Sequence, residues 1–339
     1  MKRISTLILA ALLLAAAIPA AGAEEAGGLS LSCASALLME KETGTVLYDQ
    51  NSHQQLEPAS VTKIMTLLLV MEALDDGRLS PDDLVTVSAN AAGMGGSQVY
   101  LKEGEQMPVS ELIKCVTVVS GNDCAVALAE HLYGSEGAFV AEMNRKAQEL
   151  GMADTNFVNC TGLPADGHVT TAYDIALMSR ELILNHPDIR DYTTIWMDSI
   201  RDGTFGLTNT NRLIRFYEGA TCLKTGSTDS ALYCMSATAE RDGMELIAVI
   251  MKAPTSAQRF EDAKALLDYG FANYTLVNVY PETPLAPVDV LLGTTAQVQP
   301  QLKEDCHLLV EKRQADQVTT KVTLAQDVDA PLDQVQTLG

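Results

Sequence analysis

The sequence predicts an α+β fold, in which an antiparallel sheet is flanked by helices and followed by a small all-β domain. The chain has 339 residues, 47% hydrophobic and 20% charged, so it is long enough for two domains with a buried core. Strand-like runs come first, then helical runs, then strands and a last helix, which is not the alternation of a parallel sheet. Beyond Tyr280, the prolines Pro281, Pro284 and Pro287 lead into short strand-like runs, so we expect a linker and a second domain there.

The first half of the chain predicts one hairpin and a series of helices. Two apolar runs are joined by the turn residues Glu42-Thr43-Gly44, which indicates a hairpin. The helical runs have apolar residues at spacings of three and four, and the second run is interrupted by the turn formers Ser120-Gly121-Asn122. In chain order we expect strands at residues 34–39 and 45–48 and helices at 60–74, 111–132, 138–150 and 172–184.

The second half predicts strands, one helix and then the all-β domain. Turn-rich connections separate three strand-like runs, and Lys224-Thr225-Gly226 is expected to end the first of them. The next run is an amphipathic helix with apolar Ala263, Leu266 and Leu267. We expect strands at residues 221–224, 231–238 and 245–251, a helix at 259–269, and strands at 288–292, 308–311 and 319–324.

The N-terminal residues have the pattern of a secretory signal peptide. Lys2 and Arg3 precede an apolar stretch at residues 7–18, and Ala21-Gly22-Ala23 is a small-residue cleavage site. We therefore expect residues 1–23 to be a signal peptide and the protein to be exported and secreted. An uncleaved membrane anchor is the alternative.

Charge and cysteine content exclude several classes of function. The net charge of −21 argues against nucleic-acid binding, which needs clustered Lys and Arg. The seven cysteines match no zinc-ligand spacing and the five histidines form no cluster with them, so no metal and no cofactor is expected. We interpret most of the cysteines as small buried hydrophobic residues and leave any disulfide unassigned.

Ser60-Val61-Thr62-Lys63 at a predicted helix start can supply a nucleophile and its base. A serine hydroxyl is a weak nucleophile until a base takes its proton. Lys63 lies one helical turn from Ser60, and it can act as that base if its pKa falls well below the usual value of about 10.4. Burial and a second cation would lower it, so we expect Lys63 to be enclosed, with Lys224 as the second cation. The alternative is a helix-initiating serine beside a solvated lysine.

Two further motifs complete an acyl-transfer site. Ser120-Gly121-Asn122 offers a hydroxyl that can pass a proton and an amide that can hold a peptide group, although alone it is a typical turn. Lys224-Thr225-Gly226 offers a cation and a hydroxyl for a carboxylate, although alone it is a typical strand end with a solvated lysine. The occurrence of all three motifs in this order favours the catalytic interpretation.

The sequence around these motifs resembles one enzyme family. The segments that carry the resemblance are Glu57–Thr66, Met94–Ser97, Ser120–Asp123, Asn159–Pro164 and Asn209–Leu213. They are similar to the low-molecular-mass penicillin-binding D-alanyl-D-alanine carboxypeptidases, from about residue 34 to 274 and more weakly beyond. The resemblance implies a β-lactamase/transpeptidase-like sheet with a helical subdomain at residues 24–275 and an all-β domain at 280–339. It also implies the cell envelope as location and roles in peptidoglycan biosynthesis and cell shape.

The resemblance also implies a role for each site residue. Ser60 would be the acylated nucleophile, Lys63 its base and Ser120 the proton relay. Asn122 would orient the substrate, and the Ser60 and Ser227 backbone N–H groups would form the oxyanion hole. Lys224, Thr225 and Gly226 would form the carboxylate-binding strand, with Arg259 as a basic residue near the carboxylate pocket or, alternatively, a helix-surface arginine.

The sequence departs from the family pattern at two places. Ser227 stands where the family often carries a bulkier Phe or His, so the pocket wall beside it is expected to differ. The sequence stops at Gly339, so the all-β domain is expected to be incomplete, without the amphipathic segment by which many relatives rest on the membrane. Peripheral membrane association is therefore left open.

The favoured function is removal of the terminal D-alanine from the peptidoglycan stem pentapeptide, with β-lactams as covalent inhibitors. A serine β-lactamase is the runner-up, but the commonest class needs a glutamate between the second and third motifs. Residues 151–180 contain no glutamate, which favours the peptidase. A non-catalytic penicillin-binding scaffold is the third alternative, and the intact motifs argue against it.

Overall fold

The computed structural model describes residues 29–221, 223–281, 283–302 and 306–329. The predicted signal peptide and Cys222 lie outside these ranges. A five-stranded antiparallel sheet in the order β2-β1-β9-β8-β7 forms the centre of the main body. Its strands are β1 (Ser35–Glu40), β2 (Val46–Gln50), β7 (Lys224–Thr228), β8 (Leu232–Arg241) and β9 (Met244–Ala253).

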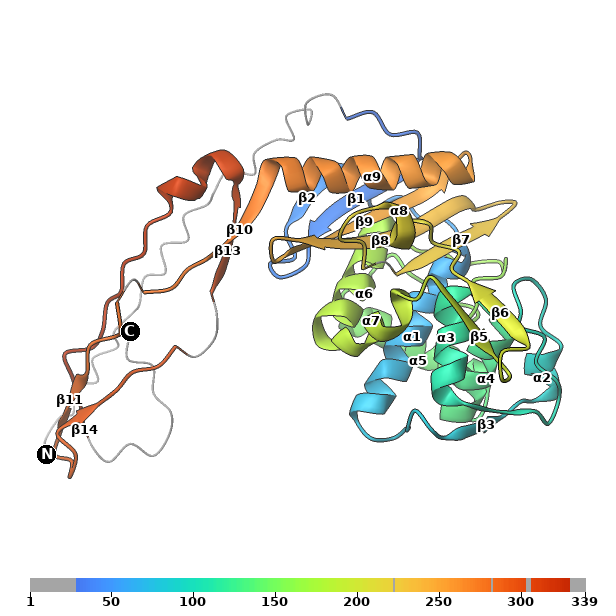
Figure 1. Ribbon diagram of the computed structural model, residues 1–339, viewed down its shortest axis with the longest axis horizontal. Helices are drawn as coiled ribbons and strands as arrows, with labels where there is room; N and C mark the ends of the chain where they lie inside the picture. The colour runs from blue at the N-terminus through green and yellow to red at the C-terminus, as the bar shows by residue number, and fades with distance from the viewer. Residues whose placement is uncertain (1–28, 222, 282, 303–305, 330–339) are drawn as a thin grey trace, which may run out of the picture. The chain divides into compact units, whose positions relative to one another are not determined.

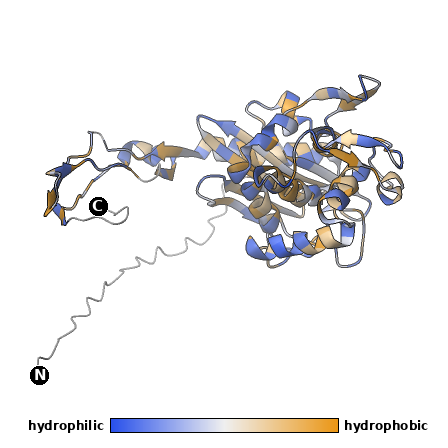
Figure 2. Ribbon diagram, turned by 90° about the horizontal axis from the view of Figure 1, so that it is seen from below, coloured by the Kyte–Doolittle hydropathy of each residue, from blue (hydrophilic) through white to orange (hydrophobic). Residues whose placement is uncertain are grey.

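Helices cover both faces of this sheet, which confirms the predicted α+β class (Figure 1). The helix α9 (Ser256–Asn273) packs on one face against β8 and β9, and α6 (Ala172–Asn185) packs on the other against β9 and β1. Strands β8 and β9 are buried along most of their length because both of their faces are covered. Figure 2 shows hydrophobic segments running through the middle of this body.

A helical part adjoins the sheet. It contains η1 (Ala59–Thr62), α1 (Lys63–Asp75), α2 (Ala89–Ala92), α3 (Val109–Val118), α4 (Asn122–Tyr133), α5 (Glu136–Glu149), η2 (Pro187–Ile189), α7 (Arg190–Thr193) and α8 (Leu213–Phe216). Two short hairpins accompany these helices, β3 (Leu84–Thr86) with β4 (Gln106–Pro108) and β5 (Met197–Ile200) with β6 (Phe205–Thr208). The apolar pattern of the sequence does not predict these hairpins, because each of their strands has only three or four residues.

Local sequence explains where the main helices begin and end. The hydroxyls of Ser135, Thr171 and Thr255 accept hydrogen bonds from backbone N–H groups in the first turns of α5, α6 and α9. Such N-caps satisfy donors that the helix itself leaves unpaired. Gly134 ends α4 with a φ of +77°, a conformation that glycine adopts without strain. The predicted break at Ser120 is confirmed, since α3 ends at Val118 and α4 begins at Asn122.

Helix α1 is the central helix of the body. Its residues from Lys63 to Met71 are all buried, because neighbouring helices surround it. The predicted helix at residues 60–74 is therefore confirmed, except that its first turn is the 3₁₀ turn η1. Ser60 lies in that 3₁₀ turn, and Lys63 is the first residue of α1.

Two strand predictions are wrong. Lys224 opens β7 rather than ending a strand, because Lys224–Thr228 pairs with β8 as a hairpin although its polar residues have no strand-like apolar pattern. Residues 319–324 form no strand, because both edges of the strand β11 (Val288–Leu291) are already paired, one with β12 (Gln297–Val298) and one with β14 (Asp327–Asp329).

The C-terminal residues form a small β domain, as predicted. It contains the three-stranded sheet β12-β11-β14 and a two-stranded sheet of β10 (Tyr274–Asn278) and β13 (His307–Glu311), followed by η3 (Lys312–Gln317). In the described part of the chain, no helix combines the length and the apolar character that crossing a membrane requires.

The cysteines behave largely as the sequence predicts. Cys33, Cys115, Cys124, Cys160 and Cys234 are buried and have no disulfide partner among the described residues, and Cys306 is exposed. Burial raises the pKa of the Cys160 thiol well above its usual range, so this thiol stays protonated and unreactive.

Candidate active site

Lys63 and Ser60 meet at the start of α1. The Lys63 amine is fully buried and lies 3.0 Å from Ser60 Oγ. Two carbonyl oxygens hold the same amine, Asn122 Oδ1 at 2.6 Å and the backbone oxygen of Thr161 at 2.7 Å. The structure thus brings the first two sequence motifs into direct contact.

This arrangement prepares the Lys63 amine to accept a proton. A neutral amine has two N–H donors and one lone pair, and the two carbonyl oxygens can only accept hydrogen bonds. When Asn122 and Thr161 take both N–H groups, the lone pair faces the Ser60 hydroxyl. Burial lowers the pKa of Lys63 to about 7, so a large fraction of the amine is neutral at neutral pH.

The loop that supplies the Thr161 oxygen carries part of the family resemblance, but the sequence predicts no role for it. Asn159 Oδ1 accepts hydrogen bonds from the backbone N–H groups of Thr161 and Gly162, at 3.1 and 2.7 Å, which fixes the turn. Gly162 has a φ of +82°, and a Cβ there would lie 1.8 Å from the backbone oxygen of Ala59. The loop therefore packs directly behind the nucleophile. Asn159 followed three residues later by Gly162 is the sequence signal that could have indicated this turn.

Ser120 and Asn122 lie at the junction of α3 and α4. Asn122 is anchored by its Nδ2, which donates to the Gly95 oxygen at 2.7 Å, and by its N–H, which donates to the Ser97 oxygen at 2.7 Å. Ser120 has a φ of +64°, and its buried Oγ has no hydrogen-bond partner among the described residues. A buried hydroxyl without a partner is costly, so it is available to a bound molecule.

Strand β7 brings the third motif beside Ser60. A Cβ on Gly226 would lie 2.8 Å from Ser60 N, so only glycine allows this approach. Lys224 is buried, and its amine donates to the Thr225 oxygen at 2.9 Å. Burial, the Lys63 charge and the Arg259 charge lower the pKa of Lys224 well below its usual range. Ser227 follows on the exposed side of the strand.

The sequence predicts that Lys224 lowers the pKa of Lys63, but in the structure Lys63 lowers the pKa of Lys224. Burial accounts for the lowered pKa of Lys63, whereas repulsion between the two amines contributes to the lowered pKa of Lys224. The physical reason is that both amines are buried, and the amine that protonates first raises the cost of charging the other. The prediction that Lys63 is enclosed is confirmed.

Arg259 is a buried residue of α9, so the helix-surface alternative is wrong. Its Nη1 donates to the backbone oxygens of Gly226 and Cys234, at 3.1 and 3.3 Å. Burial lowers its pKa to about 10. The guanidinium lies over the ring of Phe260, 4.7 Å from its centroid. Arg259 thus supports β7 from behind and adds positive charge to the site.

A hollow of about 870 Å³ adjoins this strand. Thr210 lines it and bonds to Thr225 through their hydroxyls at 2.8 Å. Ser256, which accepts from Arg259, lines it too. The remaining lining residues include Trp196, Arg212 and Phe216. The site therefore combines buried positive charge with an adjoining open space, in a chain whose net charge is −21.

His168 braces the turn that carries Ser60. Val158 N–H donates to His168 Nδ1 at 3.0 Å, so the ring proton is on Nε2, which donates to Thr62 Oγ1 at 2.8 Å. Burial lowers the pKa of His168 to about 4, and the ring is neutral at neutral pH.

We expect His168 to make folding stability fall with acid. The unfolded ring has a pKa near 6.5 and the folded ring one near 4, so the unfolded state binds more protons between these values. Stability should be complete above pH 6.5 and fall by about 3 kcal/mol on acidification to pH 4. Urea unfolding between pH 7.5 and 4 measures this, and His168→Gln should reduce the loss. The exposed control His53→Gln should keep the wild-type slope; equal slopes in both variants would contradict the assignment.

The antiparallel sheet covered by helices, together with the serine and lysine at the start of α1, defines a serine acyl-transfer enzyme. Comparison with known proteins identifies which one. Residues 21–255 match the family model described as D-alanyl-D-alanine carboxypeptidase, and residues 274–339 match that of the penicillin-binding protein 5 C-terminal domain. The chain belongs to the D-alanyl-D-alanine carboxypeptidase family.

Individual relatives agree with this. The D-alanyl-D-alanine carboxypeptidase DacF of Bacillus subtilis is 40% identical, covering 100% of this chain and 89% of the relative. Penicillin binding protein 5 of Haemophilus influenzae superposes with a TM-score of 0.79 at 30% identity, covering 92% of both chains. Ampicillin-bound penicillin-binding protein D2 of Listeria monocytogenes has a TM-score of 0.66 at 35% identity, covering 72% of this chain and 99% of that one.

Proposed function

We propose that this enzyme removes the terminal D-alanine from peptidoglycan stem pentapeptides through an acyl-enzyme at Ser60. The observation that carries the proposal is the buried Lys63 amine, 3.0 Å from Ser60 Oγ, with both of its N–H groups held by carbonyl oxygens. The family membership supports the reaction class and favours it over a β-lactamase or a non-catalytic scaffold.

Acylation follows from this geometry. Lys63 takes the proton of the Ser60 hydroxyl while Oγ attacks the carbonyl carbon of the penultimate D-alanine. The oxygen that becomes negative is bound by the N–H groups of Ser60 and Ser227, which lie in the first turn of the helical segment and on β7. The C–N bond breaks, and the proton passes from Lys63 through Ser120 to the leaving D-alanine amine. Water then hydrolyses the ester and frees Ser60.

Substrate binding uses the cationic groups of the site. The terminal carboxylate of the stem peptide binds to Lys224, whose charged form its negative charge favours, and to the Thr225 hydroxyl, with Gly226 allowing the close approach. Arg259 holds the Gly226 carbonyl and so positions this strand. Asn122 orients the substrate peptide group.

The proposed function has consequences for domains, location and inhibition. We assign residues 1–23 to a signal peptide, the residues from 24 to the start of β10 at Tyr274 to the catalytic domain, and the residues from Tyr274 onward to the C-terminal β domain, because β10 pairs with β13. Because peptidoglycan lies outside the cytoplasm, we infer that the enzyme acts in the cell envelope. We further propose that it has a role in cell shape and that it associates peripherally with the membrane. The ampicillin-bound structure of a related penicillin-binding protein supports β-lactams as covalent inhibitors acting at Ser60.

Intact-mass analysis with a penicillin and with a D-Ala-D-Ala peptide tests this proposal. We expect a stoichiometric penicillin adduct on the wild type, release of D-alanine from the peptide, and neither with Ser60→Ala. Ser80→Ala, at an exposed serine after α1, is the matched control and should behave as the wild type. An adduct that persists on Ser60→Ala would exclude Ser60. Rapid penicillin turnover without D-alanine release would favour a β-lactamase, and a wild type without any adduct would favour the scaffold.

A further inference from the structure

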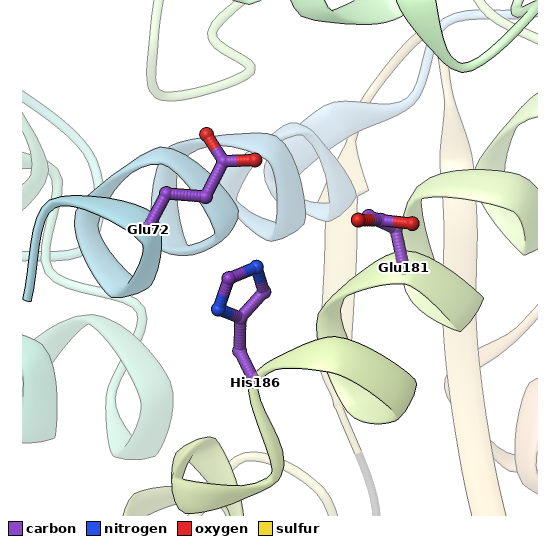
Figure 3. Close-up of side chains that lie close together, drawn as sticks. All are labelled: Glu72, Glu181 and His186. Carbon is purple, nitrogen blue, oxygen red and sulfur yellow. The ribbon is translucent and has the colours of Figure 1, made fainter. Parts of the chain in front are cut away.

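Glu72, Glu181 and His186 form a second polar cluster, separate from the Ser60 site. Glu72 lies on α1 nine residues after Lys63, which is about 14 Å along the helix. Glu181 lies on α6, and His186 is the residue that caps the end of α6. One ligand atom from each residue lies within 4.8 Å of the other two, and Figure 3 shows the imidazole turned toward the two carboxylates. The cluster lines a hollow of about 430 Å³.

The orientation of His186 leaves a lone pair facing negative charge. Its Nδ1 is bonded to the Asp75 carboxylate, which can only accept, so Nδ1 carries a proton. In the neutral ring the other nitrogen, Nε2, is then unprotonated and directed at Glu72 and Glu181. The side chain is only 10% exposed, and Nε2 has no hydrogen-bond partner among the described residues. A cation between the three groups would relieve the repulsion between the Nε2 lone pair and the two carboxylates.

Each of the three side chains is also held from behind. Asp75 fixes the imidazole, Lys146 Nζ lies 2.7 Å from Glu72 Oε1, and Asn185 Nδ2 lies 2.9 Å from Glu181 Oε1. The second oxygen of each glutamate has no hydrogen bond within the described part of the chain. In metal-binding histidines, the ring nitrogen that does not bind the metal commonly donates to a carboxylate, which orients the ring. Asp75 makes this contact with Nδ1 of His186.

The surroundings attract a cation as well. Helices α1 and α6 both end at this hollow, and neither has a basic residue in its last turn. The C-terminal end of a helix carries a partial negative charge that favours cations. Six acidic and three basic side chains line the hollow, so its charge remains negative after ion pairing.

We propose that Glu72, Glu181 and His186 bind one divalent transition-metal ion, with Zn²⁺ as the best match. An imidazole nitrogen with two carboxylate oxygens suits Zn²⁺, whereas Ca²⁺ takes six to eight oxygen ligands. Side-chain rotation must bring the three atoms to about 3.3 Å from one another, the separation around a tetrahedral zinc with bonds of about 2.0 Å. Water completes the coordination. The ion would join α1 to α6 and so stabilise the helix that begins at the active site.

Calorimetric titration of the full chain with ZnCl₂ tests this proposal. The protein carries Cys306→Ser, because an exposed thiol would itself bind zinc. We expect one equivalent of Zn²⁺ to bind and the unfolding temperature to rise by about 5 °C when zinc exceeds the dissociation constant a hundredfold. His186→Ala and Glu181→Gln should each weaken binding at least about tenfold. His131→Ala, at an exposed histidine on α4, should bind as tightly as the unsubstituted protein.

Two results would overturn the metal site. One is zinc binding with unchanged affinity in His186→Ala and Glu181→Gln. The other is the absence of any zinc binding at about 1 mM Zn²⁺. Penicillin labelling of the same variants shows whether they are folded. Because labelling depends on Ser60 and not on this cluster, it also separates the failure of this proposal from failure of the proposed function.

Discussion

Replacing Lys63 by arginine is expected to slow acylation by a penicillin about 10³-fold, the usual effect of losing a positioned general base. Arginine keeps the positive charge but has no accessible neutral form, so it cannot take the Ser60 proton. Lys63→Met removes both the charge and the base, and it should be similarly slow. The rate of labelling with a fluorescent penicillin, followed by stopped flow, measures the effect.

The pH dependence of acylation gives a second readout of the same group. The base form of Lys63 is the neutral amine, and the lowered pKa of about 7 makes it abundant above pH 7. The acylation rate should therefore rise with pH through about 7 and level off above it. At pH 6 about one tenth of the amine is neutral, and the rate should be about one tenth of the plateau. A lysine with an ordinary pKa would give a rate that still rises near pH 10.

Lys102→Arg is the matched control for this experiment. Lys102 is exposed, so the same substitution there should leave both the rate and the pH profile unchanged. Urea unfolding of Lys63→Arg shows whether the larger side chain disturbs the fold. A folded Lys63→Arg that acylates within tenfold of the wild-type rate would show that Lys63 is not the base.

The sequence could predict those parts of the site whose residues are neighbours along one element. Ser60 and Lys63 are one helical turn apart, so their spacing was sufficient to bring them together. Asn122 was found because Ser120-Gly121-Asn122 interrupts a helical pattern. The longer helices and the sheet strands β1, β2, β8 and β9 were predicted for the same reason, since the apolar period of each is local.

The sequence could not predict contacts that depend on backbone atoms or on distant segments. The Thr161 oxygen that binds Lys63 belongs to the main chain and lies 98 residues further along, so no side-chain pattern marks it. Lys224 was placed at the end of a strand because β7 is polar, and pairing with β8 rather than hydrophobicity makes it a strand. Glu72 and Glu181 are on different helices, and only the packing of α1 against α6 brings them together.

Gly162→Ala is expected to destabilise the fold by at least about 4 kcal/mol and to abolish most penicillin labelling. A Cβ at this position would lie 1.8 Å from the Ala59 oxygen and 2.3 Å from the Ala59 carbonyl carbon. Both atoms are backbone, so the loop and the turn that carries Ser60 must separate. The Thr161 oxygen would then leave Lys63, whose proton-accepting geometry depends on it. Urea unfolding and labelling kinetics on the same preparation measure both effects.

Gly167→Ala isolates the steric part of this prediction. Gly167 has a φ of +79°, close to that of Gly162, but its Cβ would have no neighbour nearer than Asn156 Nδ2 at 3.8 Å. Both variants share the strain of a left-handed alanine, about 1–2 kcal/mol, and differ in the clash with Ala59. Gly167→Ala should therefore lose only about 1–2 kcal/mol of folding stability, and penicillin should label it at close to the wild-type rate. Equal losses in the two variants would mean that contact between this loop and the Ser60 turn does not hold the nucleophile in place.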